Sequence, residues 1–176
     1  MKNTKIIAAF PACGKTYCFS NNKNLSILDS DSSQFSWVNV IDKEYEAKNR
    51  GKNDYKERYI KVRNPDFPKN YIEHIKENIG KVDYIFVSTH EEVRKALNES
   101  DIEFTIVCPE RSLKAEWVGR CFLRGSGDKF CQLIADQWDN WLDQIENEEH
   151  DCYKLKHGEY LSDIIKHIWI RLNFVF

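Results

Sequence analysis

Residues 9–16 combine the side chains and the backbone pattern that phosphate binding requires. They read Ala-Phe-Pro-Ala-Cys-Gly-Lys-Thr, and they continue an apolar run that starts at Lys5. Such a segment predicts a buried strand, a tight loop and a helix that begins near Lys15. In this arrangement successive backbone N–H groups surround a nucleotide β-phosphate, and the helix N-terminus adds its positive end. Lys15 would then contact the β- and γ-phosphates, and the Thr16 hydroxyl would bind Mg²⁺.

The predicted nucleotide contacts are consecutive in the chain: Ala9, Phe10, Pro11, Ala12, Cys13, Gly14, Lys15, Thr16 and Tyr17. One position departs from the usual G-x-x-x-x-G-K-[ST] pattern, because Ala9 stands where the first Gly is expected. Alanine is small enough for this place, but it adopts positive φ less readily than glycine. The alternative is a chance Gly-Lys-Thr in a strand-to-helix turn. The position directly after an apolar strand favours the phosphate loop.

Acidic and hydroxyl side chains follow the second predicted strand, residues 25–28. In open α/β sheets, ligands bind at the carboxyl ends of the strands. If this strand lies beside the first, Asp29 and Asp31 face the γ-phosphate. Either carboxylate is a candidate to hold Mg²⁺ or to take a proton from an acceptor hydroxyl, with Asp31 ahead as the base. Ser32 is a candidate acceptor contact in the same turn. The alternative is a solvated turn that caps the next helix.

Four further side chains are candidates for contact with the acceptor. Phe35 either stacks on a base or belongs to the core. Arg63 and Asp66 belong to a loop that two prolines make rigid, where they would contact a substrate phosphate and line a pocket, or merely precede the next helix. His90 ends the strongest apolar strand, residues 82–90, and either contacts substrate or caps a helix.

Residues 110–128 form a basic segment that ends in Gly-Ser-Gly. On a helix Arg120 and Arg124 share one face because they are four positions apart, and Arg111 precedes them. Cations on a mobile segment can neutralise the charge that develops during phosphoryl transfer, so we expect a lid over the nucleotide. A basic surface helix is the alternative.

Short apolar strands alternate with helical patterns along the chain, which predicts a single α/β domain over residues 1–176. A stretch dense in both charges, residues 42–62, indicates an exposed insertion that is partly helical or mobile. The remaining elements are expected as strands at 104–108 and 152–156 and helices at 71–78, 91–98, 129–149 and 161–172.

Composition gives limits on the partners and the compartment. The chain has 176 residues and a net charge of −2, so no global basic field favours nucleic acid, although a local basic groove stays open. No apolar run approaches a membrane span of about 20 residues. The six cysteines fit neither a zinc site nor a disulfide framework, and with no signal-peptide pattern we expect a reducing cytoplasm. Cys13 in the loop is a candidate for alkylation, and the sequence leaves the oligomeric state open.

Several segments of the sequence resemble those of the P-loop nucleoside monophosphate kinase-like proteins, a group of small kinases that are often phage-encoded. The resemblance covers roughly residues 5–165. It rests on residues 9–16, on Leu-Asp-Ser-Asp-Ser-Ser-x-Phe-Ser-Trp at 28–37, on Arg-Asn-Pro-Asp-Phe-Pro at 63–68, and on Arg-x-x-x-Arg-Gly at 120–125. Only the first of these is a motif with a well-understood mechanism.

The resemblance implies a three-layer α/β/α fold with a mainly parallel sheet and a helical lid. It also implies ATP and Mg²⁺, with transfer of the γ-phosphoryl to a small nucleotide or nucleoside-like acceptor. A similarity to polynucleotide kinases, which place a base after the second strand, keeps a polynucleotide or modified-base hydroxyl open as the acceptor. That alternative predicts a basic groove lined by Lys52, Lys56, Arg58, Lys61 and Arg63. A nucleotide-binding module without turnover is the third alternative.

Overall fold

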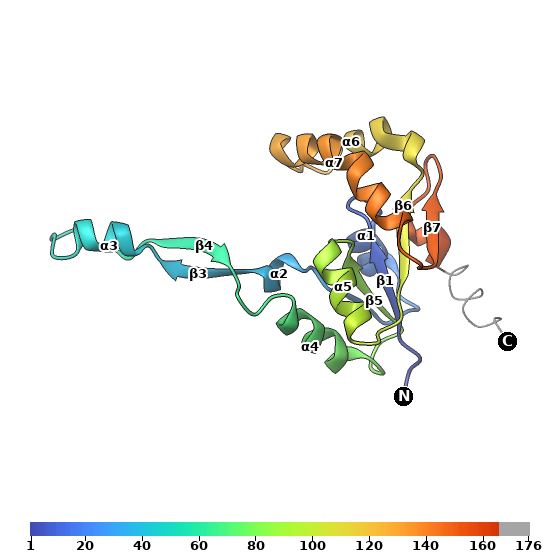
Figure 1. Ribbon diagram of the computed structural model, residues 1–176, viewed down its shortest axis with the longest axis horizontal. Coiled ribbons are helices and arrows are strands. Elements are labelled where there is room, and N and C mark those ends of the chain that lie inside the picture. The colour runs from blue at the N-terminus through green and yellow to red at the C-terminus, as the bar shows by residue number, and fades with distance from the viewer. Residues whose placement is uncertain (166–176) are drawn as a thin grey trace.

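A computed structural model describes residues 1–165 of the chain (Figure 1). Its centre is a five-stranded parallel sheet in the order β2-β5-β1-β6-β7, and helices flank the sheet. The strands of this sheet are β1 (Lys5–Ala9), β2 (Ile27–Asp29), β5 (Tyr84–Ser88), β6 (Thr105–Pro109) and β7 (Cys152–Leu155). The helices are α1 (Lys15–Asn21), α2 (Ser33–Ser36), α3 (Lys43–Asn49), α4 (Lys69–Asn78), α5 (Glu91–Glu99), the 3₁₀ turn η1 (Arg111–Leu113), α6 (Lys114–Leu123) and α7 (Asp128–Glu146). The α/β class and the mainly parallel sheet are therefore confirmed.

The central strands of the parallel sheet are apolar on both faces. The three central strands β5, β1 and β6 are continuous apolar runs, and nearly every residue in them is buried. Such strands are stable only with helices over both faces of the sheet. Removing this apolar surface from water is the main favourable contribution to folding.

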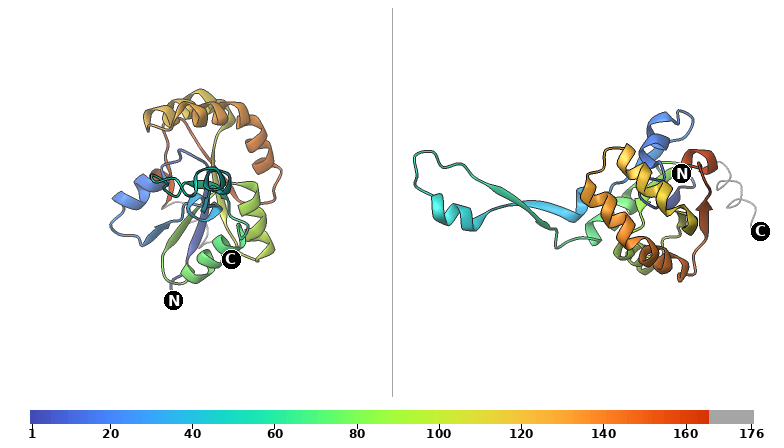
Figure 2. Two further views of the ribbon diagram at one scale, coloured as in Figure 1. Left: turned by 90° about the vertical axis from the view of Figure 1, so that its left-hand side faces the viewer. Right: turned by 90° about the horizontal axis from the view of Figure 1, so that it is seen from above.

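The connections place the loops after β1 and β5 side by side. From β1 the chain crosses to β2 at one edge, and from β5 it crosses over β1 to β6 in the opposite direction. Since both crossovers of this kind are right-handed, α1 and α5 lie on opposite sides of the sheet (Figure 2). A crevice between two such strands, at their carboxyl ends, is where open α/β sheets bind ligands.

Most of the expected helices and strands are found, although their first and last residues differ from the expectation. The pairing partner of the second strand also differs. The second strand does not lie beside the first, because β5 pairs with both of them. Of the terminal helix expected at 161–172, residues 161–165 are helical. The rest of that helix and the apolar tail lie outside the described residues.

The charged insertion is an arm, which we define as residues 37–63. Strands β3 (Trp37–Ile41) and β4 (Tyr59–Arg63) pair as an antiparallel hairpin, and α3 lies at its tip. The arm extends away from the sheet (Figures 1 and 2). The exposed and partly helical character is as expected, but the two strands were not expected, because their pairing partner lies about 20 residues away across the charged stretch.

Among the helices of residues 1–165, none combines the length and the apolar character needed to cross a membrane.

Candidate functional site

The predicted phosphate loop forms a tight turn between β1 and α1. The Phe10 N–H donates to the Val107 carbonyl across 2.8 Å, which anchors the loop to β6. Ala12 and Gly14 have positive φ, 62° and 90° respectively. Ala9 lies inside β1, paired with Ser88, in ordinary strand geometry. Alanine in place of glycine at position 9 therefore causes no backbone strain. The left-handed conformation is adopted by Ala12 instead.

Cys13 points inward from this loop and is fully buried. Its thiol lies 3.8 Å from the Val107 carbonyl. Burial raises the pKa of Cys13 to about 12, so the thiolate that alkylating reagents attack is scarce at neutral pH. The expectation that Cys13 is open to alkylation is therefore wrong.

Lys15 folds back over the loop that precedes it. Its ammonium donates to the Ala9 carbonyl across 2.7 Å. Burial lowers the pKa of Lys15 most, the positive charge of Arg124 lowers it further, and the carboxylates of Asp29 and Asp31 raise it. The charges of Asp29, Asp31 and Arg124 thus act on Lys15. Asp29 ends β2, Asp31 lies in the turn that follows β2, and Arg124 follows α6.

Thr16 and Asp29 form the second part of the site. The Thr16 hydroxyl donates to Asp29 Oδ2 across 2.8 Å, although β2 is separated from β1 by β5. Asp29 reaches Thr16 because α1 packs over β2. A hydroxyl and a carboxylate are oxygen ligands of the kind that Mg²⁺ takes while it keeps waters and phosphate oxygens. Within residues 1–165, no cluster of three or more His, Cys, Asp or Glu side chains is arranged for a metal.

Asp31 and Ser32 follow in the turn after β2. The Asp31 carboxylate is exposed and accepts from the Ser33 N–H across 2.9 Å, so it also serves as a local turn contact. Ser32 is buried and its carbonyl accepts from the Ser36 N–H, which closes the short helix α2. The structure thus leaves Asp31 facing solvent, with its charge acting on Lys15, and takes Ser32 into the fold.

Arg63 ends strand β4 at the base of the arm, and His90 precedes α5. The Arg63 guanidinium contacts the Glu92 carboxylate and lies over the Phe67 ring, 4.5 Å from its centroid. Desolvation lowers the pKa of His90 most, and the charges of Glu92, Arg63, Lys15 and Asp31 act on it as well. The charges of Arg63 at the base of the arm and of Lys15 in the predicted phosphate loop thus both act on His90.

Two other acceptor candidates lie apart from this group. The Phe35 ring packs against Tyr71 and His74 of α4, with centroid distances of 5.1 and 4.7 Å. This is the core alternative for Phe35. Asp66 is exposed in the loop before α4, where its backbone N–H donates to the Asn64 side chain.

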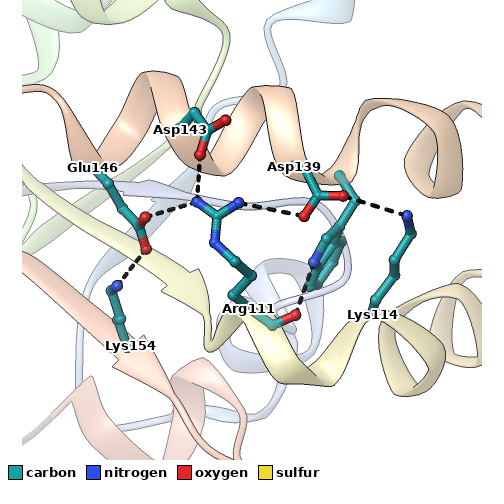
Figure 3. A network of polar contacts seen from close by, with 7 residues as sticks. Arg111, Lys114, Asp139, Asp143, Glu146 and Lys154 are labelled. Atoms are coloured by element: carbon teal, nitrogen blue, oxygen red, sulfur yellow. Dashed lines mark hydrogen bonds and ion pairs between the residues drawn. The ribbon is translucent and has the colours of Figure 1, made fainter.

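The three arginines of the predicted lid have three different environments. Arg111 turns toward α7, where its guanidinium contacts the carboxylates of Asp139, Asp143 and Glu146 at 3.3, 2.6 and 2.7 Å (Figure 3). Hydrogen bonds to Glu146 and Asp143 raise the pKa of Arg111 above its usual value. This guanidinium is thus bound to the outer surface of α7 rather than directed at the phosphate loop.

Arg120 is buried between two aromatic rings. Its guanidinium carbon lies 4.0 Å from the Trp117 ring centroid and 3.9 Å from that of Tyr160. It donates to Glu116 on α6 and to the Glu159 carbonyl, so both its charge and its planar faces are occupied.

Arg124 is the exposed arginine of the three. It follows the end of α6, donates to the Ser126 hydroxyl across 2.6 Å and lies over the Phe130 ring. Its positive charge lowers the pKa of Lys15.

Sequence reasoning missed the groups that hold the loop from outside. The Trp117 indole N–H donates to the Pro11 carbonyl across 2.8 Å, and the Leu161 N–H donates to the Cys13 carbonyl at the same distance. Tyr160 packs so closely on Gly14 that an added Cβ would lie 3.2 Å from its ring. No local motif marks the segment at 159–161, since it contacts the loop only through the fold.

Comparison of the chain with models of protein families and with curated protein sequences gives no match.

Proposed function

We propose that this chain is an ATP-dependent phosphotransferase of the P-loop kinase type, which moves the γ-phosphoryl of ATP to a small nucleotide or nucleoside-like acceptor. The observation that carries the proposal is the convergence at one end of the sheet. Lys15 and the Thr16–Asp29 pair meet at the loop after β1, within electrostatic reach of Asp31 and Arg124. A cation, a metal-binding oxygen pair and backbone N–H groups in one place suit the β- and γ-phosphates of a nucleotide.

The loop residues divide the binding between them. The backbone N–H groups of Ala12, Gly14, Lys15 and Thr16 surround the β-phosphate, and the Lys15 ammonium exchanges the Ala9 carbonyl for phosphate oxygens. Thr16 and Asp29 would hold Mg²⁺, which supplies neutralisation of phosphate charge when bound. Most of the rate enhancement in such transfers comes from positioning and charge stabilisation, so rigid anchoring of the loop by β6 and Trp117 serves the chemistry directly.

Asp31, Arg63 and His90 form the acceptor side of the proposed site. If the acceptor is a hydroxyl, the exposed Asp31 carboxylate takes its proton as the acceptor oxygen bonds to the γ-phosphorus. The bond from that phosphorus to the β,γ-bridging oxygen breaks, and ADP leaves. A phosphate acceptor needs no such base, and Arg63 would bind it in exchange for Glu92.

We assign different roles to the three arginines than the helical spacing alone suggests. Arg124 is the cation that can move over the transferring phosphoryl group, because it is exposed and close to Lys15. Arg120 acts as a positioning residue that fixes Tyr160 against Gly14. Arg111 ties η1 to α7.

The test is transfer of label from γ-labelled ATP to a panel of nucleoside monophosphates, nucleosides and 5′-hydroxyl oligonucleotides, with Lys15→Ala as the control. We expect transfer to a monophosphate or a nucleoside by the wild type, and none by Lys15→Ala although it stays folded. Transfer only to oligonucleotides would show that the acceptor is a polynucleotide hydroxyl rather than a small nucleotide or nucleoside. ATP binding without any transfer would favour a nucleotide-binding module and contradict the proposal, as would full activity of Lys15→Ala.

A further inference from the structure

The arm is built without a core of its own. Across residues 37–63 no residue is buried, and both faces of the hairpin are open (Figures 1 and 2). A two-stranded hairpin alone is marginally stable in water. A segment of this length that projects from a compact sheet is therefore expected to contact something outside the molecule.

The charge of the arm is opposite to that of the whole chain. Residues 37–63 contain eight Lys and Arg and five Asp and Glu, a net charge of +3 in a chain of net charge −2. Two of the acidic side chains are paired with arginines of the arm, Asp42 with Arg58 and Glu46 with Arg50. In the described part of the chain, no carboxylate lies within ion-pair distance of the arm's five lysines, Lys43, Lys48, Lys52, Lys56 and Lys61.

One face of the hairpin alternates aromatic and basic side chains. In the strand register Trp37 is opposite Arg63, Asn39 is opposite Lys61, and Ile41 is opposite Tyr59, and alternation puts these six residues on the same face. Trp37 is 48% exposed and Tyr59 is 55% exposed. Exposed rings that stack with bases, between cations that neutralise phosphates, are the usual means of binding a single strand.

The length of the arm exceeds what a mononucleotide needs. Five-residue strands extend about 17 Å, and α3 adds about 10 Å. Charges at the tip are thus beyond the Debye length of about 8 Å from a small acceptor near His90. Arg63, at the base of the arm, is the arm residue whose charge acts on His90. The tip lysines therefore suit a ligand that continues outward from the site.

We propose that the arm binds single-stranded nucleic acid, with bases stacked on Trp37 and Tyr59 and phosphates along Lys61, Lys56 and Lys52. This proposal concerns binding and does not depend on phosphoryl transfer. A second copy of the chain is the less suitable occupant. The opposite face of the hairpin is aliphatic, but its four side chains, Val38, Val40, Ile60 and Val62, offer far less than the roughly 800 Å² per partner of a stable interface. Two arms of net charge +3 would also repel each other.

The experiment is fluorescence anisotropy with labelled oligo(dT) and oligo(U) of about 16 nucleotides, without ATP, at roughly 0.05 to 0.2 M salt. The test variant combines Lys52→Gln, Lys56→Gln and Lys61→Gln. The matched control removes three exposed lysines elsewhere, with Lys76→Gln, Lys95→Gln and Lys129→Gln. Each phosphate contact contributes about 0.7 to the slope of log affinity against log salt, so the arm variant should lose about 2 from that slope and bind at least tenfold more weakly. The control should bind like the wild type.

A second variant separates stacking from charge. Trp37→Ala with Tyr59→Ala should weaken binding roughly tenfold and leave the salt slope unchanged. The circular dichroism spectrum and thermal midpoint of each variant check that the sheet is intact. The proposal is overturned if neither strand binds at the lowest salt, or if both lysine variants weaken binding equally. It is also overturned if sedimentation shows a dimer that the arm variants dissociate, in the absence of strand binding. Because the assay omits ATP, its result stands apart from the transfer experiment.

Discussion

At the scale of single residues, the proposed site depends on backbone conformation as much as on charged groups. The sequence pattern pointed to Ala9 as the anomalous loop position, but Ala9 has ordinary strand geometry. Ala12 carries the left-handed conformation instead, at φ 62°. For a residue with a Cβ this costs roughly 1–2 kcal/mol. Such strain is maintained because the anchored ends of the loop leave the chain no alternative.

The strain at Ala12 gives a prediction on stability. Ala12→Gly should relieve it, and after the entropy that glycine adds to the unfolded chain, about 0.4–1 kcal/mol, a net gain of roughly 0.5–1 kcal/mol remains. For a chain of this size that raises the thermal midpoint by about 1–4 °C. Calorimetry measures it. Ala47→Gly is the control, since Ala47 is exposed in α3 and its replacement should lower stability. Equal losses in both variants would contradict the assignment of strain to Ala12.

At the scale of elements, helix α6 and the segment after β7 hold the phosphate loop from outside. Trp117 donates to Pro11, Tyr160 covers Gly14, and Arg120 lies between the two rings. The expected lid is thus an element that supports the loop at Arg120 and leaves Arg124 exposed. Its helical spacing was predictable, whereas the different environments of the arginines were not, because they depend on residues far away in the sequence.

The two arginines four positions apart should therefore respond differently to the same change. Arg120→Lys loses the planar stacking on both rings and part of the contact with Glu116, and we expect a loss of about 2–3 kcal/mol in urea unfolding. Arg124→Lys should change stability by less than about 0.5 kcal/mol but reduce phosphoryl transfer. A stable and inactive Arg120→Lys protein would show that Arg120 acts on phosphate directly.

At the scale of the whole molecule, the sequence predicted the individual strands and helices, because these depend on residues close together in the chain. The apolar runs gave β1, β5 and β6, and the motif at 9–16 gave the loop and the start of α1. Strand order did not follow, because whether β2 pairs with β1 or β5 depends on contacts across more than 50 residues. The arm was predicted as charged and exposed, but its hairpin was not, since the two strands flank a charged stretch that hides their pairing. The contact of Tyr160 with Gly14 was missed because it joins residues that are far apart in the sequence.

The arrangement of these elements agrees with separate roles for the sheet and the arm in ligand binding. The sheet places the loop, Asp29, Asp31 and His90 along its carboxyl edge, and the arm begins beside them at Arg63. We infer that the sheet positions the phosphates and that the arm selects what lies beyond them.

The most direct test of this account is the affinity for ATP with Mg²⁺, measured by titration calorimetry on the wild type and on Lys15→Ala. If residues 12–16 bind the β- and γ-phosphates, the wild type binds one ATP. Loss of the ammonium then weakens binding at least about 30-fold, as expected for removal of a buried charged contact. The thermal midpoint without ATP should stay near that of the wild type. Equal affinity of the two proteins for ATP, or no binding by either, would contradict the phosphate loop and every role assigned around it.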